Sequence, residues 1–443
     1  LEWNIAKGLK ATAKVHGDVY TYSVEDRIAV YSRTTSMYSE KVQRFQEFNY
    51  EAMLHYGTAL KDFTLNAFIG TNLMHQRRNI NNGETQGGLI IPEYYNLSNA
   101  TSVLTTDKTY RKEIRSVLGS ASLGWKSLLF ADATFRNDWS STLPSGENSY
   151  FYPSFSGSFI FTELEPVKSI SWLNFGKVRL GWAQVGNDTD PYSLSRTYEY
   201  KNSSFGGVPN YGQDVILNNA HLKPELTNSV EAGLELKLLN NRVGVDFTYY
   251  NNLTKNQIMQ VPLAVSSGYT SQWMNAGEIS NKGVEVVLNI VPVQTKDFRW
   301  EAIFNWSKNN NKVEKLNDQL KTLQIASSFV ALHATVGRPY GELMGYNYVY
   351  DTDGNKVVAS NGVYAKTAQT ESLGSVLPDW LGGVRNSFQY KNFDAGFLID
   401  VRKGGSFYSI TQQYGMYSGT LEETAANGIR ENGLVLDGVQ GTV

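Results

Sequence analysis

The chain has 443 residues, of which 41% are hydrophobic and 13% aromatic, and it contains no Cys. The lack of Cys excludes disulfides, thiolate metal sites and a cysteine nucleophile. Lys plus Arg number 40 and Asp plus Glu 42, so the net charge of −2 argues against a general nucleic-acid or anionic-surface binder. Mean hydropathy is −0.35 and no apolar run of about 18 residues occurs, so no transmembrane helix is predicted.

The first part of the chain predicts three strands and two polar segments. Strands are expected at 8–22, 47–56 and 63–70, where apolar and polar side chains alternate with the period of two of a β-strand. The polar segments 24–42 and 71–112 lack a clear alternation, and we expect both to be loops.

The alternation becomes stronger between residues 114 and 182. Strands are expected at 114–123, 129–135, 150–162 and 178–182. In the second of these, Asp132 and the following Arg136 fall on the face opposite the apolar side chains. A second long polar segment follows, from residue 186 to residue 223.

The clearest pattern is the predicted hairpin at 227–256. Its first strand has one apolar face and one charged or small face that carries Glu231 and Glu235; its second strand carries Asp246 on the corresponding face. Asn240 and Asn241 suit the tight reversal between the strands, because Asn tolerates positive φ. Each strand has about 10 residues or slightly more, the span of a tilted transmembrane strand. A soluble β-sandwich hairpin would have the same pattern.

The last part of the chain repeats the pattern. Strands are expected at 284–290, 298–306 and 393–401, with Glu285, Arg299 and Glu301 on the polar faces. Aromatic side chains at strand ends, such as Trp125, Trp139 and Trp306, are typical of interfacial girdles, although aromatics are common in any strand.

The connections alternate between short and long, and this asymmetry favours a membrane barrel over a sandwich. We count roughly 14 strands of the length that a tilted membrane strand requires. The predicted fold class is therefore all-β, a transmembrane antiparallel β-barrel. Residues 1–443 are expected to form a partial outer-membrane barrel without a plug, with long extracellular loops at about 71–112, 186–225, 257–281, 307–378 and 404–443. The expected lumen-facing residues are Asp132, Arg136, Glu231, Glu235, Asp246, Glu285, Arg299 and Glu301.

Six short strings, in order and between strands, carry a family resemblance. They lie at 136–144, 152–154, 176–187, 222–231, 275–285 and 378–383. Together they resemble the SusC/RagA family of TonB-dependent outer-membrane transporters over roughly residues 115 to 405.

The resemblance implies a barrel of about 22 strands with an N-terminal plug. This sequence contains no plug, so we expect it to be the middle and later part of such a barrel. The resemblance also implies a SusD-like surface lipoprotein as a lid, energy from the TonB–ExbB–ExbD complex, and oligosaccharides or peptides as substrates. Its implied location is the outer membrane of a Gram-negative, Bacteroidetes-like bacterium, where the barrel contacts lipid.

Aromatic residues in the predicted loops are candidate substrate contacts. Aromatic faces suit sugar C–H groups and peptide side chains. The candidates are Tyr211, Tyr269, Trp273, Tyr346 and Trp380. Packing within the loops is the alternative for each of them.

The segment from Asp351 to Asn355 begins like a calcium loop, with Asp351 and Asp353 as candidate metal ligands. The Glu expected at the twelfth position of such a loop is absent, because Gly362 stands there. An Asp-Gly turn between two short extended runs is the favoured interpretation.

The sequence contains none of the motifs that would indicate an enzyme. The five His lack metal-ligand spacing, and HExxH, GxSxG, P-loop and GxGxxG motifs do not occur. We therefore expect no catalytic residues and no cofactor. The alternative functions are a passive outer-membrane porin or adhesin, a soluble carbohydrate-binding β-protein, and an outer-membrane hydrolase.

Overall fold

The computed structural model describes residues 1–205, 208–317 and 320–441. The chain divides into two compact units. Unit 1 comprises residues 1–241 and 252–277, and unit 2 comprises residues 242–251 and 278–443. Both units consist mainly of antiparallel strands, which confirms the all-β prediction.

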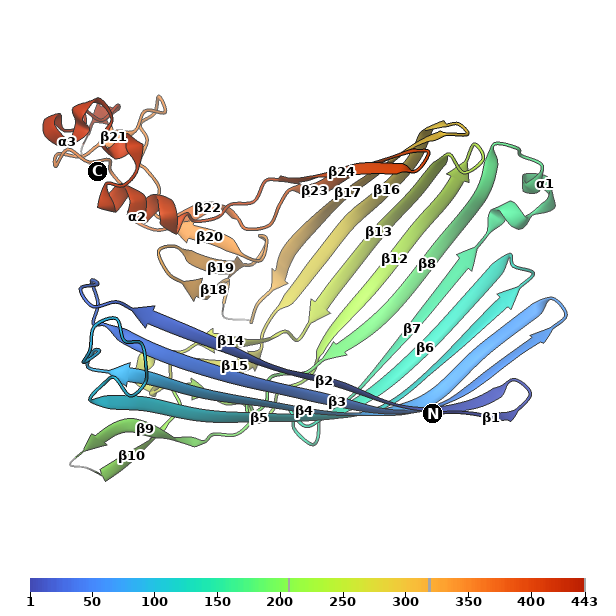
Figure 1. Cartoon of the computed structure of the whole chain (residues 1–443), viewed down its shortest axis with the longest axis horizontal. Helices are drawn as coiled ribbons and strands as arrows, with labels where there is room; N and C mark the ends of the chain where they lie inside the picture. Colours follow the sequence, from blue (N-terminus) through green and yellow to red (C-terminus); the bar gives the residue numbers. More distant parts are fainter. Residues whose placement is uncertain (206–207, 318–319, 442–443) are drawn as a thin grey trace. The chain divides into compact units, whose positions relative to one another are not determined.

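Unit 1 contains a ladder of nine antiparallel strands, in which β1 to β8 pair in chain order and β8 then pairs with β12 (Figure 1). They are β1 (Glu2–Ala6), β2 (Leu9–Ile28), β3 (Met37–Leu60), β4 (Phe63–Gln86), β5 (Ser102–Trp125), β6 (Leu129–Ser140), β7 (Ser149–Phe159), β8 (Leu173–Asn187) and β12 (Glu225–Leu238).

The short reversals of unit 1 use backbone conformations with positive φ. Gly8 has φ 77°, Lys61 has φ 51°, and Asn240 has φ 55°. Asn240 has the left-handed conformation that its side chain tolerates, as the sequence predicts. The connection after β7 is longer and holds η1 (Phe161–Glu163) and α1 (Glu165–Lys168).

Two predicted loops of unit 1 are largely strand. β2 continues to Ile28 and β3 begins at Met37, so the prediction of a loop at 24–42 was wrong for most of that segment. The predicted loop at 71–112 is strand as far as Gln86 and again from Ser102. The segments of β2 to β5 that extend beyond the predicted strands have polar side chains on both faces. Apolar and polar residues do not alternate where neither face is apolar.

The long connections of unit 1, after β8 and after β13 (Val243–Lys255), hold small sheets of their own. β9 (Tyr198–Phe205) pairs with β10 (Val208–Gln213). A second small sheet has the order β11-β15-β14, and η2 (Val265–Ser267) connects its outer and central strands. Its strands are β11 (Ile216–Leu217), β15 (Ser271–Asn275) and β14 (Ile258–Pro262). The predicted loops at 186–225 and 257–281 are therefore partly built from short strands.

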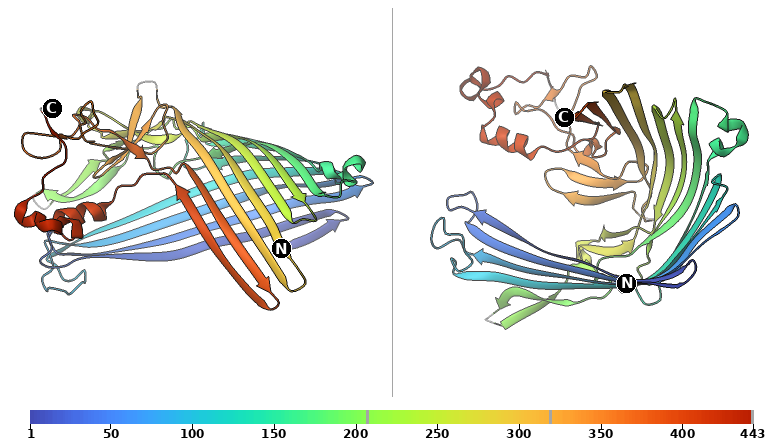
Figure 2. Two further views of the ribbon diagram at one scale, coloured as in Figure 1. Left: turned by 90° about the horizontal axis from the view of Figure 1, so that it is seen from above. Right: turned by 45° about the vertical axis from the view of Figure 1, so that its right-hand side comes forward.

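Unit 2 has a ladder of four antiparallel strands and a smaller four-stranded sheet. The ladder follows the order β16 (Glu278–Gln294), β17 (Phe298–Lys315), β23 (Trp380–Tyr390) and β24 (Phe393–Lys403), and Figure 2 shows its last two strands side by side. The smaller sheet consists of β18 (Thr322–Ser327), β19 (Ala331–Thr335), β20 (Glu342–Gly345) and β22 (Glu371–Ser375). The predicted loop at 307–378 thus contains a sheet. β13 (Val243–Lys255) is divided between the two units.

The segment after β24 contains helices, which the sequence pattern did not indicate. α2 (Ile410–Ser418) begins where the Ser409 hydroxyl accepts a hydrogen bond from the Gln412 N–H, and it ends at Gly419 with φ 72°. The turns η3 (Glu422–Thr424) and η4 (Ala426–Gly428), the helix α3 (Ile429–Asn432) and the strand β25 (Val439–Gln440) follow. β25 pairs in parallel with β21 (Val357–Val358). None of the helices in the described ranges has both the length and the hydrophobicity needed to cross a membrane.

The strand register gives each ladder an apolar face. In unit 1, Val230 lies opposite Trp182 and Leu234 lies opposite Val178. Leu180 and Phe155, on the same face, are 61% and 57% exposed. A continuous band of exposed apolar side chains indicates a non-aqueous neighbour.

Candidate functional site

The polar face of unit 1 carries four of the predicted lumen residues. Asp132 lies opposite Ser156 of β7. The residue of β8 that pairs with Ser156 also pairs with Glu231 of β12, so these residues form one cross-strand row. The Ser156 hydroxyl donates a hydrogen bond to the Asp132 carboxylate at 3.4 Å. Glu235 forms an ion pair of 2.9 Å with Lys177 on β8. Arg136 lies on the same face, four residues after Asp132.

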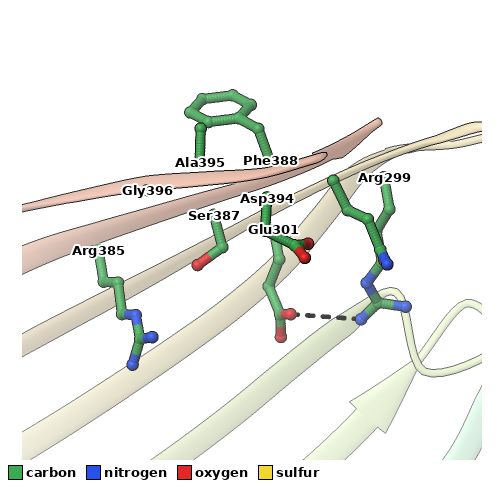
Figure 3. A pocket seen from close by; sticks show the side chains of 9 residues that line it. Arg299, Glu301, Arg385, Ser387, Phe388, Asp394, Ala395 and Gly396 are labelled. Carbon is green, nitrogen blue, oxygen red and sulfur yellow. Dashed lines mark hydrogen bonds and ion pairs between the residues drawn. The ribbon is translucent and has the colours of Figure 1, made fainter. Parts of the chain in front are cut away.

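The polar face of unit 2 contains a pocket of about 400 Å³ formed by β17, β23 and β24 (Figure 3). Arg299 and Glu301 lie in it 3.4 Å apart, and the Asn289 amide donates to Glu301 at 3.0 Å. In Figure 3, Arg385 and Ser387 point to the same side as Glu301. The pocket therefore presents both charge signs and suits a polar solute or water.

The other two predicted lumen residues also lie in unit 2. Glu285 lies opposite Ser307, and Ser307 shares a face with Glu301 because the two are six residues apart on β17. Asp246 accepts a hydrogen bond of 3.4 Å from the Thr248 hydroxyl on the same strand.

Two groups of polar side chains lie at the ends of neighbouring strands of unit 1, and the second group also reaches the loop after β8; we call the two groups together the rim cluster. In the first, Arg136 donates to Asp138 at 2.7 Å, and the Tyr152 hydroxyl donates to the same carboxylate at 2.6 Å. In the second, Lys112 and the Ser140 hydroxyl each contact Asp188 at 2.5 Å. The side chains of Asp138 and Asp188 are only 7% and 5% exposed, so their charges depend on these partners.

The strings that carry the family resemblance hold the loops in place. Asn275 donates to the carbonyl of Lys223 at 2.7 Å and accepts from its N–H at 2.8 Å. Glu225 accepts a hydrogen bond from the Ile258 N–H at 2.7 Å. Leu222 is fully buried against Leu143 and Tyr150. These residues thus stabilise the loop bases.

Sequence reasoning missed the rim cluster beyond Arg136. Asp138 and Asp188 each stand beside an Asn at the end of a strong strand pattern, and Lys112 lies in a segment that lacked any pattern. A charged residue at a strand end is ordinarily solvated, so only the three-dimensional register reveals that both carboxylates are buried and that Lys112 pairs with one of them.

A groove of about 720 Å³ lies between β5 and the loop of the rim cluster; we call it the rim groove. Its lining residues are Thr105, Thr106, Asp107, Lys108, Thr109, Tyr110, Asp190, Pro191, Tyr192, Ser193, Thr197, Asp214, Ile216, Asn218 and Trp273. The ring centroids of Tyr110 and Tyr192 are 6.1 Å apart. The Asn218 amide donates to the carbonyl of Tyr192 at 2.9 Å, which holds this wall together.

The structure places the five candidate aromatics in different settings. Trp273 is in β15 and lines the rim groove. Tyr269 lies against the Arg196 guanidinium, 5.6 Å from its ring centroid, and its hydroxyl is 3.5 Å from Gln213. Tyr211 is exposed on β10 of the same unit.

The remaining two aromatics belong to unit 2. Tyr346 is exposed, and the Lys366 ammonium lies 4.5 Å from its ring centroid. Trp380 is not in a loop, because it is the first residue of β23 and lies opposite Lys403 of β24. Its prediction as a loop residue was therefore wrong.

The segment from Asp351 to Asn355 has the geometry of a turn. The Asp351 carboxylate accepts hydrogen bonds from the N–H groups of Asp353 at 2.9 Å and Asn355 at 2.7 Å. The side-chain and backbone hydrogen bonds from Asn355 lower the pKa of Asp351 below its ordinary value. Within the described residues, no group of three or more His, Cys, Asp or Glu side chains is placed to hold a metal ion.

Long antiparallel strands with one exposed apolar face and one charged face are typical of a class, the β-barrel membrane proteins. The family model "TonB dependent receptor-like, beta-barrel" matches residues 1–433. The chain therefore belongs to this family, which confirms the predicted fold class and the resemblance. The family consists of receptors and transporters rather than enzymes.

Curated relatives agree with this assignment. TonB-dependent receptor P3 of Formosa agariphila is 28% identical over 68% of this chain and 32% of its own length. TonB-dependent receptor SusC of Bacteroides thetaiotaomicron is 28% identical over 60% of this chain and 29% of its own length. The chain thus spans about a third of the length of the curated relatives it matches.

Solved structures share the fold. The RagAB peptide transporter superposes with a TM-score of 0.74 at 20% identity, over 90% of this chain and 46% of that chain. The siderophore receptor PiuA from Acinetobacter baumannii gives a TM-score of 0.51 at 12% identity, over 90% of this chain and 53% of that chain.

Proposed function

We propose that the protein containing this chain is an active outer-membrane importer. The observation that carries the proposal is the pair of faces on the strands: an exposed apolar band on one side and rows of charged residues on the other. In an outer-membrane barrel, the apolar face contacts lipid and the charged face lines a wet lumen. Asp132, Glu231 and Glu235 would then line the passage of the solute, as would Arg299 and Glu301.

The connections support an orientation. All reversals with few residues lie at one end of the ladder of unit 1, and the long connections that carry the rim cluster and rim groove lie at the other. Outer-membrane barrels place short turns in the periplasm and long loops outside the cell. The rim groove would therefore meet solutes before they enter the lumen.

The energy source and the lid are part of the proposal. Membership of a TonB-dependent family supports coupling to the TonB–ExbB–ExbD complex through parts of the protein outside this chain. The likeness to SusC supports a SusD-like surface lipoprotein over the long loops. Such a pair would capture oligosaccharides or peptides, with loop aromatics such as Tyr211, Tyr269 and Tyr346 as further contacts.

A pull-down from native outer membranes tests the proposal. The full-length protein would carry an affinity tag, and partners and bound solutes would be identified by mass spectrometry. We expect a surface lipoprotein to co-purify together with a glycan or a peptide. A barrel recovered without a lipoprotein would favour a passive porin or an adhesin, and a protein absent from the membrane fraction would contradict the proposal.

A further inference from the structure

The upper half of β5 has an open edge. β4 pairs with β5 along its whole length, from Ser102 to Trp125. β6 pairs with β5 only from Ile114 onward. Within the described parts of the chain, no strand pairs with the β6 side of Ser102 to Lys112. An unpaired strand edge is a template for an additional strand.

The backbone groups that face this edge can be assigned. The carbonyl of Glu113 accepts the Ser141 N–H at 2.9 Å, and the Glu113 N–H donates to the Ser141 hydroxyl at 2.9 Å, so Glu113 faces the β6 side. The N–H and C=O groups of successive residues in an antiparallel strand point to opposite sides of that strand. Thr105, Asp107 and Thr109 therefore present N–H and C=O groups to the same edge, about 7 Å apart from one to the next.

This edge is one wall of the rim groove. Residues Thr105 to Tyr110 line the groove on one side, and Tyr192, Asn218 and Trp273 line it on the other. The Asn219 amide donates to the carbonyl of Trp273 at 3.0 Å, so the second wall is built from bonded segments. The volume of about 720 Å³ is within the range of ligand pockets, about 300–1,000 Å³.

We infer that an extended peptide binds in the rim groove as an added strand on β5. The peptide backbone would exchange hydrogen bonds with Thr105, Asp107 and Thr109, and its alternate side chains would reach the aromatic pair of Tyr110 and Tyr192. The inference rests on the proposed import function and narrows its substrate class to peptides.

The chemistry of the groove favours a peptide over a glycan. A peptide supplies donors and acceptors at the repeat of a strand edge, which a sugar chain does not reproduce. The lining also includes three carboxylates, Asp107, Asp190 and Asp214, and one Lys, Lys108, and the Arg78 guanidinium lies 4.5 Å from the centroid of the Tyr110 ring. Peptides with a basic residue beside an aromatic or aliphatic residue would match this lining.

The test uses the purified full-length protein with a tryptic digest of casein as the probe. Retained peptides are identified by mass spectrometry, and one is synthesised with N-methyl groups at single positions. We expect N-methylation to weaken binding about five- to tenfold at alternate positions only, because each such group removes one backbone hydrogen bond. Retention of malto-oligosaccharides with no peptide retained would overturn the inference.

A matched pair of variants tests the β5 edge itself. Asp107→Pro removes an N–H group that faces the open edge, and proline is tolerated at such positions, whereas Asp107→Ala keeps the N–H. We expect Asp107→Pro to bind the synthetic peptide about fivefold more weakly than Asp107→Ala. Equal affinities for the two folded variants would contradict the inference, and so would N-methyl effects without a period of two.

The N-methyl series requires only the unmodified protein, so it decides the matter if Asp107→Pro does not fold. Import measured in cells separates this inference from the proposed function. Peptide import with equal affinities for Asp107→Pro and Asp107→Ala overturns the β5 site alone. A protein that imports no solute contradicts the proposed function on which the inference rests.

Discussion

The two halves of β5 share one backbone path but differ in their surroundings. Residues 114–125 pair with strands on both sides, and their apolar residues Val117 and Leu123 alternate with Ser116 and Ser122. Residues 102–112 pair on one side only, and polar residues occupy both of their faces. Apolar and polar residues therefore alternate where the two faces of a strand have different surroundings, and they do not alternate where both faces contact water.

The largest effect is expected from a charged residue placed on the apolar face of a strand that pairs with neighbours on both sides. Leu234→Arg should destabilise the protein by about 2–4 kcal/mol, because a charged side chain facing lipid near the bilayer midplane carries that cost. Urea unfolding of the protein in phospholipid vesicles measures the change in the free energy of unfolding.

The neighbouring position gives the control. Glu235→Gln keeps the shape of the side chain and removes only the attraction of a partly exposed ion pair with Lys177, so we expect a loss of about 0.2–1 kcal/mol. An equal loss of stability in Leu234→Arg and Glu235→Gln would contradict the assignment of the two faces.

A variant in the rim cluster tests whether specific polar contacts hold the loop after β8 in place. Asp188→Ala should cost about 2 kcal/mol locally, because it removes the buried carboxylate that pairs with Lys112 and accepts a hydrogen bond from the Ser140 hydroxyl. The expected result is faster limited proteolysis between residues 188 and 224, with the unfolding of the strands little changed.

Asp190→Ala is the matched control for that variant. Asp190 is exposed on the same loop, two residues after Asp188, so its replacement should leave proteolysis near the wild-type rate. Proteolysis that increases equally in both variants would show that the buried contacts do not hold the loop.

The smallest expected effect concerns the turn at Asp351. The pKa of this carboxyl is lowered in the folded protein, so its stabilisation is present above the unfolded pKa and is lost as pH falls through the folded pKa. Hydrogen exchange of the Asp353 and Asn355 amides, corrected for intrinsic rates, should therefore increase only below about pH 4. Asp351→Asn should show weaker protection already at pH 7, and a pH-independent wild type would contradict the turn's dependence on this charge.

Sequence reasoning correctly predicted strands where one face is apolar and the other is polar. The predicted strand from Val230 to Leu238 lies within β12, and that from Phe393 to Val401 lies within β24. In both, an apolar face alternates with a polar face along the strand, and this period of two is a local signal that a single sequence carries.

The extensions of β2 to β5 and the rim cluster could not be predicted in the same way. β2 to β5 continue beyond the predicted strands because cross-strand hydrogen bonds, rather than hydrophobic contacts, extend them. The rim cluster joins Lys112 to Asp188 across 76 residues of sequence, a contact that no local pattern encodes. Trp273 was a candidate binding residue, but the open edge of β5 emerges only from the pairing register.

The most direct test of the central claim, active import, is solute uptake in the native cells. Uptake of the peptide or glycan recovered with the protein would be measured in cells with TonB and in cells without it. We expect saturable uptake that requires both this protein and TonB. Uptake that depends on the protein but is unchanged without TonB would show a passive channel and contradict the proposal.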